Sequence, residues 1–128
     1  MDEFRVPASE ILARLEKIQQ EMQKKEIEGV LVGQQVDLFY FTGTAQNGYL
    51  YIPAAGEPLL LIKKYLPRAM KESPLKQIVG IDSVKEIPGR IADYYGRLPG
   101  VLGLEFDVMP VKQFHFYQSL FADRQFVD

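Results

Sequence analysis

The side chains best placed to do chemistry are carboxylates that follow predicted strands. Asp82 comes after one such strand, and Glu105 and Asp107 end another, where residues i and i+2 point to the same face. Two or three such groups could hold Mg²⁺ for two-metal phosphoryl transfer, as in a small nuclease. The alternative, which we favour, is that these strand ends meet solvent and that Asp107 starts a turn or caps the next helix.

The sequence contains few other residues of the types that act in catalysis. It has one histidine, His115, and no cysteine, which excludes disulfides, thiolate metal sites, cysteine nucleophiles and His-rich metal cages. No second ligand-type residue lies at ligand spacing from His115 on its predicted helix, and no serine lies in a Gly-x-Ser-x-Gly motif. Apart from the nuclease alternative, the sequence therefore predicts no catalytic residue and no metal ligand.

A run of aromatic residues beside a loop of small residues is a candidate contact region. Five large rings lie within the thirteen residues 39–51, next to the loop over 43–48. Such rings usually belong to a core, and the alternative is that a tyrosine hydroxyl and the loop amides contact a partner or ligand. The candidate substrate-pocket or interface residues are Tyr40, Thr42, Gly43, Gln46, Asn47 and Tyr49.

Length and charge place the chain among ordinary globular domains. It has 128 residues, is 47% hydrophobic and carries a net charge of −2, so it can bury an apolar core without disulfides. The absence of any run of five or six like charges argues against a dedicated nucleic-acid or membrane-surface binder. The first residues do not form a signal peptide, and no apolar run reaches the length of a membrane span. We therefore expect a cytoplasmic protein that binds neither nucleic acid nor membrane.

The elements that would position these residues alternate between helices and strands. One apolar stripe predicts a helix over 9–25 with Ser9 as its N-cap and ion pairs Glu10–Arg14 and Glu21–Lys25. A hairpin over 49–62 means that the sheet is not purely parallel. The other expected elements are a buried strand over 29–33, a helical turn over 37–43 ended by Gly43, a helix over 65–72 with Leu66, Ala69 and Met70 inward, a strand over 77–81, a helix from Pro88 to Gly96, a strand over 101–106, a helix over 110–121 and an edge strand over 125–128.

Six short motifs follow one another along nearly the whole chain. They are RLE at 14–16, IEGVLV at 27–32, YFTG at 40–43, EPLLL at 57–61, VLGLE at 101–105 and FVD at 126–128. In this order they resemble the N-terminal domain of the creatinase, prolidase and Xaa-Pro aminopeptidase family. That family usually places glycine where this chain has Glu26, and a non-glycine residue there needs a left-handed or altered turn.

The resemblance implies one domain over residues 1–128, an α/β fold with a mixed sheet and flanking helices in a ribonuclease-H-like arrangement. In that family two divalent metal ions lie in a separate C-terminal pita-bread domain, which we expect this chain to lack. The N-terminal domain forms a homodimer and covers the partner subunit's active site. The resemblance thus implies a non-catalytic domain of a Xaa-Pro peptidase-like metallohydrolase. A stand-alone α/β module that binds a protein or ligand, and the nuclease using Asp82, Glu105 and Asp107, remain the alternatives.

Overall fold

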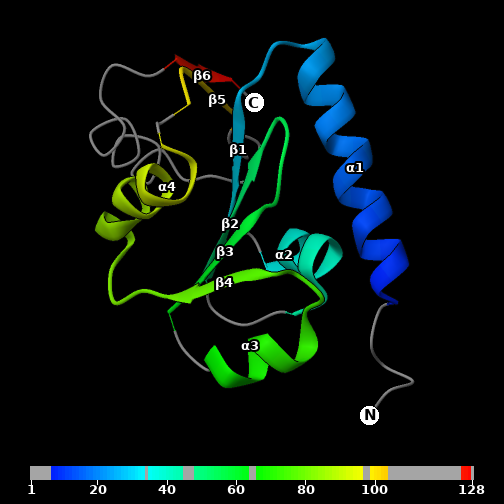
Figure 1. Ribbon diagram of the computed structural model, residues 1–128, viewed down its shortest axis with the longest axis vertical. Helices are drawn as coiled ribbons and strands as arrows, with labels where there is room; N and C mark the ends of the chain where they lie inside the picture. The colour runs from blue at the N-terminus through cyan, green and yellow to red at the C-terminus, as the bar shows by residue number, and fades with distance from the viewer. Residues whose placement is uncertain are drawn as a thin grey trace.

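One mixed sheet with helices on both of its faces forms the framework of the domain (Figure 1). The computed structural model describes residues 7–33, 35–44, 48–63, 66–96, 99–103 and 125–127. Within these residues, six strands pair in the order β4-β3-β2-β1-β5-β6. They are β1 (Gly29–Val32), β2 (Gly48–Pro53), β3 (Leu59–Ile62), β4 (Gln77–Gly80), β5 (Val101–Gly103) and β6 (Gln125–Val127). The predicted α/β fold with a mixed sheet is confirmed.

The direction of the strands follows from the hairpin. β2 runs antiparallel to β1 and β3, whereas the pairs β3–β4, β1–β5 and β5–β6 are parallel. The turn between β2 and β3 contains Gly56 at φ 103°, a conformation that glycine adopts without steric cost. The predicted hairpin and edge strand are therefore confirmed, the latter as β6 at the end of the sheet.

The helices divide between the two faces of the sheet (Figure 1). They are α1 (Ala8–Lys24), α2 (Gln35–Thr42), α3 (Leu66–Glu72) and α4 (Ile87–Tyr95), with the 3-10 turn η2 (Val84–Glu86) before α4. Buried side chains of α1, α2 and α3 pack together on one face, and those of α4 pack on the other. None of the described helices is long and apolar enough to cross a membrane.

Successive side chains of the central strands point to opposite faces of the sheet, so each face has its own hydrophobic core. Leu50 and Ile52 of β2 join the core under α1, whereas Tyr51, between them, joins the core under α4. Both cores are needed because β1, β2 and β3 lie inside the sheet and are covered on both sides. The apolar run of 29–33 is thus explained by burial on two faces.

Helix α1 confirms the predicted stripe but not all of the predicted polar contacts. It begins at Ala8 after Pro7, whose carbonyl accepts the N–H groups of Glu10 and Ile11, so the expectation that Ser9 caps the helix is wrong. The Glu10–Arg14 pair is confirmed at 3.0 Å. Glu21 pairs with Lys24 at 3.7 Å, and the predicted partner Lys25 is already the C-cap residue.

The turn after α1 contains a non-glycine residue in the left-handed conformation, as expected for Glu26. Glu26 adopts φ 58°, its N–H donates to the Gln23 carbonyl, and the N–H of Ile27 donates to the Met22 carbonyl at 2.9 Å. This pair of hydrogen bonds is a Schellman motif, which ends helices and usually places glycine at the left-handed position. The chain therefore keeps the turn geometry with a glutamate, at a conformational cost of about 1 kcal/mol.

The short helix α3 corrects one expectation about burial. Ala69 is fully buried as predicted, but Met70 is 57% exposed, so its predicted inward orientation is wrong. Successive residues of a helix point about 100° apart, and Ala69 takes the position that faces the sheet. The side chain of Leu66 lies outside the described part of the chain.

Capping signals bound the segment formed by the 3-10 turn η2 and helix α4. The Glu86 carboxylate accepts the N–H groups of Asp82 and Ser83 at 2.7 and 2.9 Å, and these hydrogen bonds hold the pKa of Glu86 below its usual value. Pro88 lies in the first turn and Gly96 ends the helix at φ 79°, as predicted. The strand predicted over 101–106 is confirmed for Val101–Gly103. Residues 104–106 and the helix predicted over 110–121, with His115, lie outside the described residues.

Candidate functional site

The predicted contact residues lie on different faces of the sheet. Tyr40 belongs to α2, which packs on the α1 face, whereas Tyr49 packs against the core on the α4 face. Thr42 and Gly43 are buried at the end of α2. Gln46 and Asn47 lie outside the described residues. The structure therefore brings Tyr40, Thr42 and Gly43 together and separates them from Tyr49.

Two neighbouring rings of α2 reach the surface. Phe39 is 41% exposed and Tyr40 is 47% exposed, and we call this pair the α2 aromatic surface. The Arg14 guanidinium of α1 lies 4.2 Å from the centre of the Tyr40 ring and donates to the Tyr40 carbonyl at 2.8 Å. Its other nitrogen pairs with Glu10. Arg14 therefore fixes the position of an exposed ring, which lowers the entropy cost of burying that ring against a partner.

Thr42 and Gly43 have an evident role in positioning α2. The buried Thr42 hydroxyl donates to the Leu38 carbonyl at 2.6 Å and accepts the Thr44 N–H at 3.2 Å. Gly43 adopts φ 79°, and a β-carbon on it would lie 3.3 Å from the Glu72 carbonyl of α3. The Thr44 hydroxyl donates to the Glu72 carboxylate at 2.7 Å. These contacts end α2 and tie it to α3, which holds the α2 aromatic surface in place.

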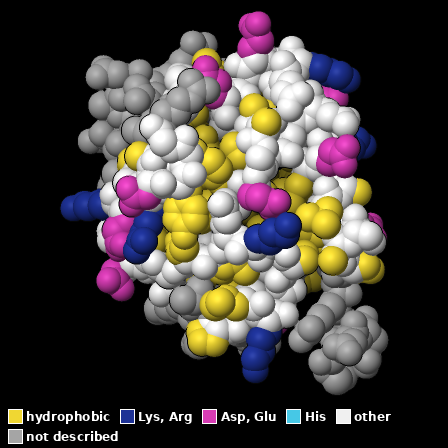
Figure 2. Space-filling model, viewed as in Figure 1, with side chains coloured by type: hydrophobic (Ala, Val, Ile, Leu, Met, Phe, Trp, Pro, Cys, Tyr) yellow, Lys and Arg dark blue, Asp and Glu magenta, His cyan; other side chains and the backbone are white. Residues whose placement is uncertain are grey.

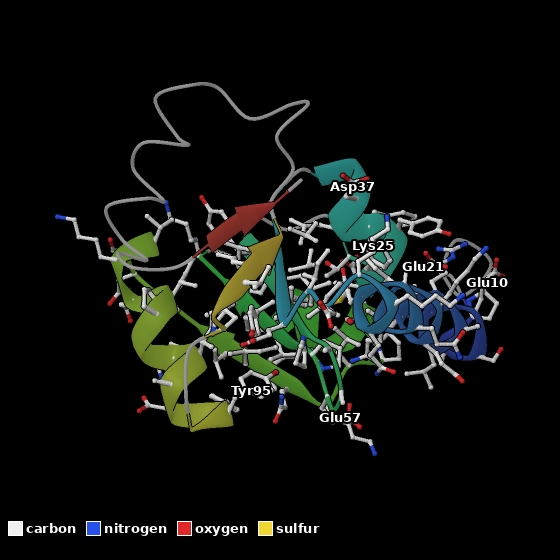
Figure 3. The ribbon with its side chains drawn as sticks, turned by 90° about the horizontal axis from the view of Figure 1, so that it is seen from above. Glu10, Glu21, Lys25, Asp37, Glu57 and Tyr95 are labelled. Carbon is white, nitrogen blue, oxygen red and sulfur yellow. The ribbon has the colours of Figure 1, made fainter. Side chains whose placement is uncertain are left out.

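On the opposite face, Tyr51 and Tyr95 form an aromatic pair. Their ring centres are 5.3 Å apart, and the planes are inclined by 55°. The Tyr95 hydroxyl donates to the Glu57 carbonyl at 2.5 Å and accepts the Gln77 side-chain amide at 3.1 Å. Burial raises the pKa of Tyr95 to about 12. Figure 3 shows Tyr95 on α4 and Glu57 at the hairpin turn on the same side of the molecule.

Of the three carboxylates that motivated a nuclease site, the structure describes only Asp82. Asp82 is exposed just beyond β4, and Glu105 and Asp107 lie outside the described residues. Gly103, the last residue of β5, is four strand spacings from β4, or about 19 Å at the usual separation of strands. In the part of the chain that the structure describes, no group of three or more His, Cys, Asp or Glu side chains could hold a metal ion.

A comparison with protein families identifies one match. Residues 14–128 match the creatinase/prolidase N-terminal domain family. This match spans most of the chain, including every strand of the described sheet. No curated protein sequence matches the chain.

Solved structures share the fold at low sequence identity. The N-terminal domain of an X-Pro dipeptidase from Streptococcus pyogenes is 21% identical, with a TM-score of 0.73, and the match covers 90% of this chain and 92% of that one. The N-terminal domain of the cytoplasmic peptidase PepQ from Mycobacterium tuberculosis H37Rv is 21% identical, with a TM-score of 0.77 and coverage of 90% and 91%. A Xaa-Pro dipeptidase from Bacillus anthracis is 17% identical, with a TM-score of 0.78, and the match covers 91% of this chain but only 33% of that one.

Proposed function

The chain belongs to the creatinase/prolidase N-terminal domain family, and from this we propose that it serves as the non-catalytic N-terminal domain of a Xaa-Pro peptidase-like metallohydrolase. One observation carries the proposal: the fold matches about a third of the Bacillus anthracis Xaa-Pro dipeptidase, which leaves two thirds of that enzyme for other parts. In this proposal two divalent metal ions and the hydrolytic residues belong to a C-terminal catalytic domain. The present domain helps to position the substrate and to enclose the active site, and it takes no part in making or breaking bonds.

We propose that the domain acts through dimerisation, with a second copy covering the α2 aromatic surface. Rigidly held rings at the surface are typical of the centre of protein interfaces. Closed two-fold pairing is the commonest way for soluble proteins to bury such a patch. Hydrophobic side chains also reach the surface over the strands between α1 and α4, where a catalytic domain or partner could cover them (Figure 2). A paired domain would then lie over its partner's active site and narrow the path of the substrate.

We expect the isolated 128-residue chain to hydrolyse no Xaa-Pro peptide and to retain no stoichiometric transition metal. With one histidine and no cysteine, the chain has few of the ligands that bind these metals tightly. The measurements are elemental analysis of dialysed protein and turnover assays with Xaa-Pro dipeptides in the presence of Mn²⁺, Co²⁺ or Zn²⁺. Stoichiometric metal or measurable hydrolysis would contradict the proposal.

Self-association of the chain should depend on the α2 aromatic surface. We expect a homodimer whose dissociation constant rises at least about tenfold when Phe39 and Tyr40 are both replaced by serine, because both exposed rings are then lost from the interface. Sedimentation velocity over a wide concentration range measures this constant. The matched control is Tyr94→Ser, which removes a ring that is 40% exposed on α4 and should leave the dimer unchanged.

Two outcomes would refute this interface. One is a strictly monomeric protein at high concentration. The other is an equal effect of the Tyr94→Ser control and of the double substitution, which would place the contact elsewhere or show a general effect on folding. Far-UV circular dichroism of each variant separates a lost interface from a lost fold.

A further inference from the structure

Strand β4 lies at one edge of the sheet and has a single neighbour, β3, among the described strands (Figure 1). An edge strand presents unpaired backbone N–H and C=O groups, to which a further strand can bind. Proteins usually protect such an edge with a charged residue, a proline or a bulge. The four residues of β4, QIVG, include no charge and no proline, pair with β3 in unbroken register and are all partly exposed. This edge is therefore open to pairing.

The hydrogen bonds to β3 show which backbone groups of β4 face outward. The N–H of Ile81, just beyond the strand, donates to the Ile62 carbonyl of β3 at 2.9 Å. In a strand the N–H and C=O of one residue point to the same side, and the side alternates from one residue to the next. Val79 therefore turns its backbone groups toward β3, as Ile81 does, whereas Ile78 and Gly80 turn theirs away. A further strand could pair with Ile78 and Gly80 without disturbing the bonds to β3.

A second copy of β4 fits these outward groups. When two β4 strands run antiparallel about a two-fold axis at Val79, Ile78 of each copy lies opposite Gly80 of the other, and the outward groups of both strands form hydrogen-bonded pairs. The Ile78 side chain, on the α1 face of the sheet, then lies beside a residue that has no side chain. The two Val79 side chains meet on the α4 face as an apolar pair. The pairing therefore satisfies the backbone and fits the side chains on both faces.

The charges on either side of β4 favour a second copy over a strand of another protein. Lys76 precedes the strand and Asp82 follows it, each three residues from Val79, so Lys76 of each copy lies opposite Asp82 of the other. A register shifted by two residues would place Lys76 opposite Gly80 and lose both charge pairs. The Lys76 side chain is 80% exposed, and its Nζ lies 4.0 Å from a Glu57 oxygen, a contact that contributes little at this exposure. The strand is thus complementary to itself in charge.

We propose that β4 pairs antiparallel with the β4 strand of a second copy, through the backbone groups of Ile78 and Gly80 and the charges of Lys76 and Asp82. The sheet then continues from one domain into the next. Because the paired strands are short, the association is weak and depends on concentration. The contact uses other elements than the α2 aromatic surface and does not depend on the proposed function. A chain with both contacts assembles beyond a dimer.

Hydrogen exchange of single amides in the 128-residue chain tests this contact, followed by two-dimensional ¹H–¹⁵N NMR. We expect a Kd of about 1 mM or tighter, so exchange of the Ile78 and Gly80 amides should slow at least about twofold between about 0.02 and 1 mM protein. The Val79 amide faces β3 and should exchange at one rate throughout. Replacing both Phe39 and Tyr40 by serine should leave this slowing unchanged, so the failure of either interface can be told from that of the other.

Charge reversals then test the register. Lys76→Asp and Asp82→Lys each place like charges opposite one another, so each variant alone should raise the Kd at least about fivefold. An equimolar mixture of the two variants should recover the slowing at Ile78 and Gly80, because opposite charges face one another again at both ends. The matched control is Lys24→Asp, which makes the same change of charge on an exposed side chain of α1 and should leave the slowing unchanged.

Three outcomes would overturn the proposal. They are exchange of the Ile78 and Gly80 amides that does not depend on concentration up to about 1 mM, equal effects of Lys76→Asp and Lys24→Asp, and a mixture that pairs no better than its two components. The first measurement uses the unmodified chain, so it decides even if a charge reversal impairs folding.

Discussion

Replacing Gly48 by alanine is expected to lower the free energy of unfolding by at least about 3 kcal/mol, because the new methyl group has no space. A β-carbon on Gly48 would lie 2.2 Å from the Leu61 carbonyl oxygen and 3.1 Å from the Ile62 α-carbon. These are backbone atoms of β3, the strand paired with β2, so they cannot move without breaking the register between Gly48 and Ile62. Urea denaturation of the variant and of the unmodified chain measures the loss.

Gly89→Ala provides the matched control for this substitution. Gly89 lies in α4, and a β-carbon there would meet no atom within 4 Å. The same chemical change should therefore stabilise the protein by about 0.5–1 kcal/mol through the better helix propensity of alanine. A Gly48→Ala protein as stable as the unmodified chain would mean that the close approach of β2 and β3 is wrong.

Leu31→Ala is expected to lower the free energy of unfolding by about 2–5 kcal/mol, since it leaves a cavity in a core that cannot fully collapse. Leu31 is 2% exposed and belongs to the core under α4. Its strand, β1, pairs with β2 on one side and β5 on the other. The midpoint of a urea transition should fall while the slope stays unchanged, as for a change in stability alone.

Leu12→Ala separates the effect of burial from that of side-chain size. Leu12 is 52% exposed on α1, so the same truncation should change stability by no more than about 0.5 kcal/mol. A loss below about 1 kcal/mol for Leu31→Ala would show that β1 behaves as an edge strand and not as the centre of the sheet.

Hydrophobic periodicity was sufficient to predict the order of the described elements. The stripe on α1, the buried run of β1 and the hairpin each follow from a local pattern in the sequence, and each is present. The errors in these elements concern single residues, namely the cap at Ser9, the partner of Glu21 and the orientation of Met70. Ser9 is a good capping residue, but the helix begins one residue before it, at Ala8, with Pro7 as its N-cap. A shift of one residue is set by backbone geometry that composition does not reveal.

The separation of Tyr40 from Tyr49 could have been found from the sequence. Residues 49–52 alternate, so Tyr49 and Tyr51 had to share one face and Leu50 and Ile52 the other. Helix α2 carries Leu38 into the same core as Leu50, which places its rings on the face opposite Tyr49. Grouping aromatic residues by their distance along the chain overlooked this alternation.

A pocket of about 280 Å³, with Glu28, Tyr51 and Tyr95 in its lining, could not have been found in the same way. Its residues come from segments that the sheet brings together. Glu28 belongs to the IEGVLV motif, which carries the family resemblance and does not indicate a pocket, and Tyr95 is the last residue of a helix. The distance between Asp82 and the end of β5 likewise depends on the strand order. Strand order is a property of the whole sheet, whereas the sequence patterns used are local.

The pairing of β1 with β5 has a consequence for how the chain folds. The hydrogen bond between Glu28 and Gly100 joins residues 72 positions apart, whereas β1, β2 and β3 are consecutive strands, with α2 between β1 and β2. Closing a long loop costs entropy before its contacts form, so pairings that are distant in sequence form late. The folding nucleus is therefore expected in the β1–β2–β3 meander with α1, and β5 joins a sheet whose central strands are already paired.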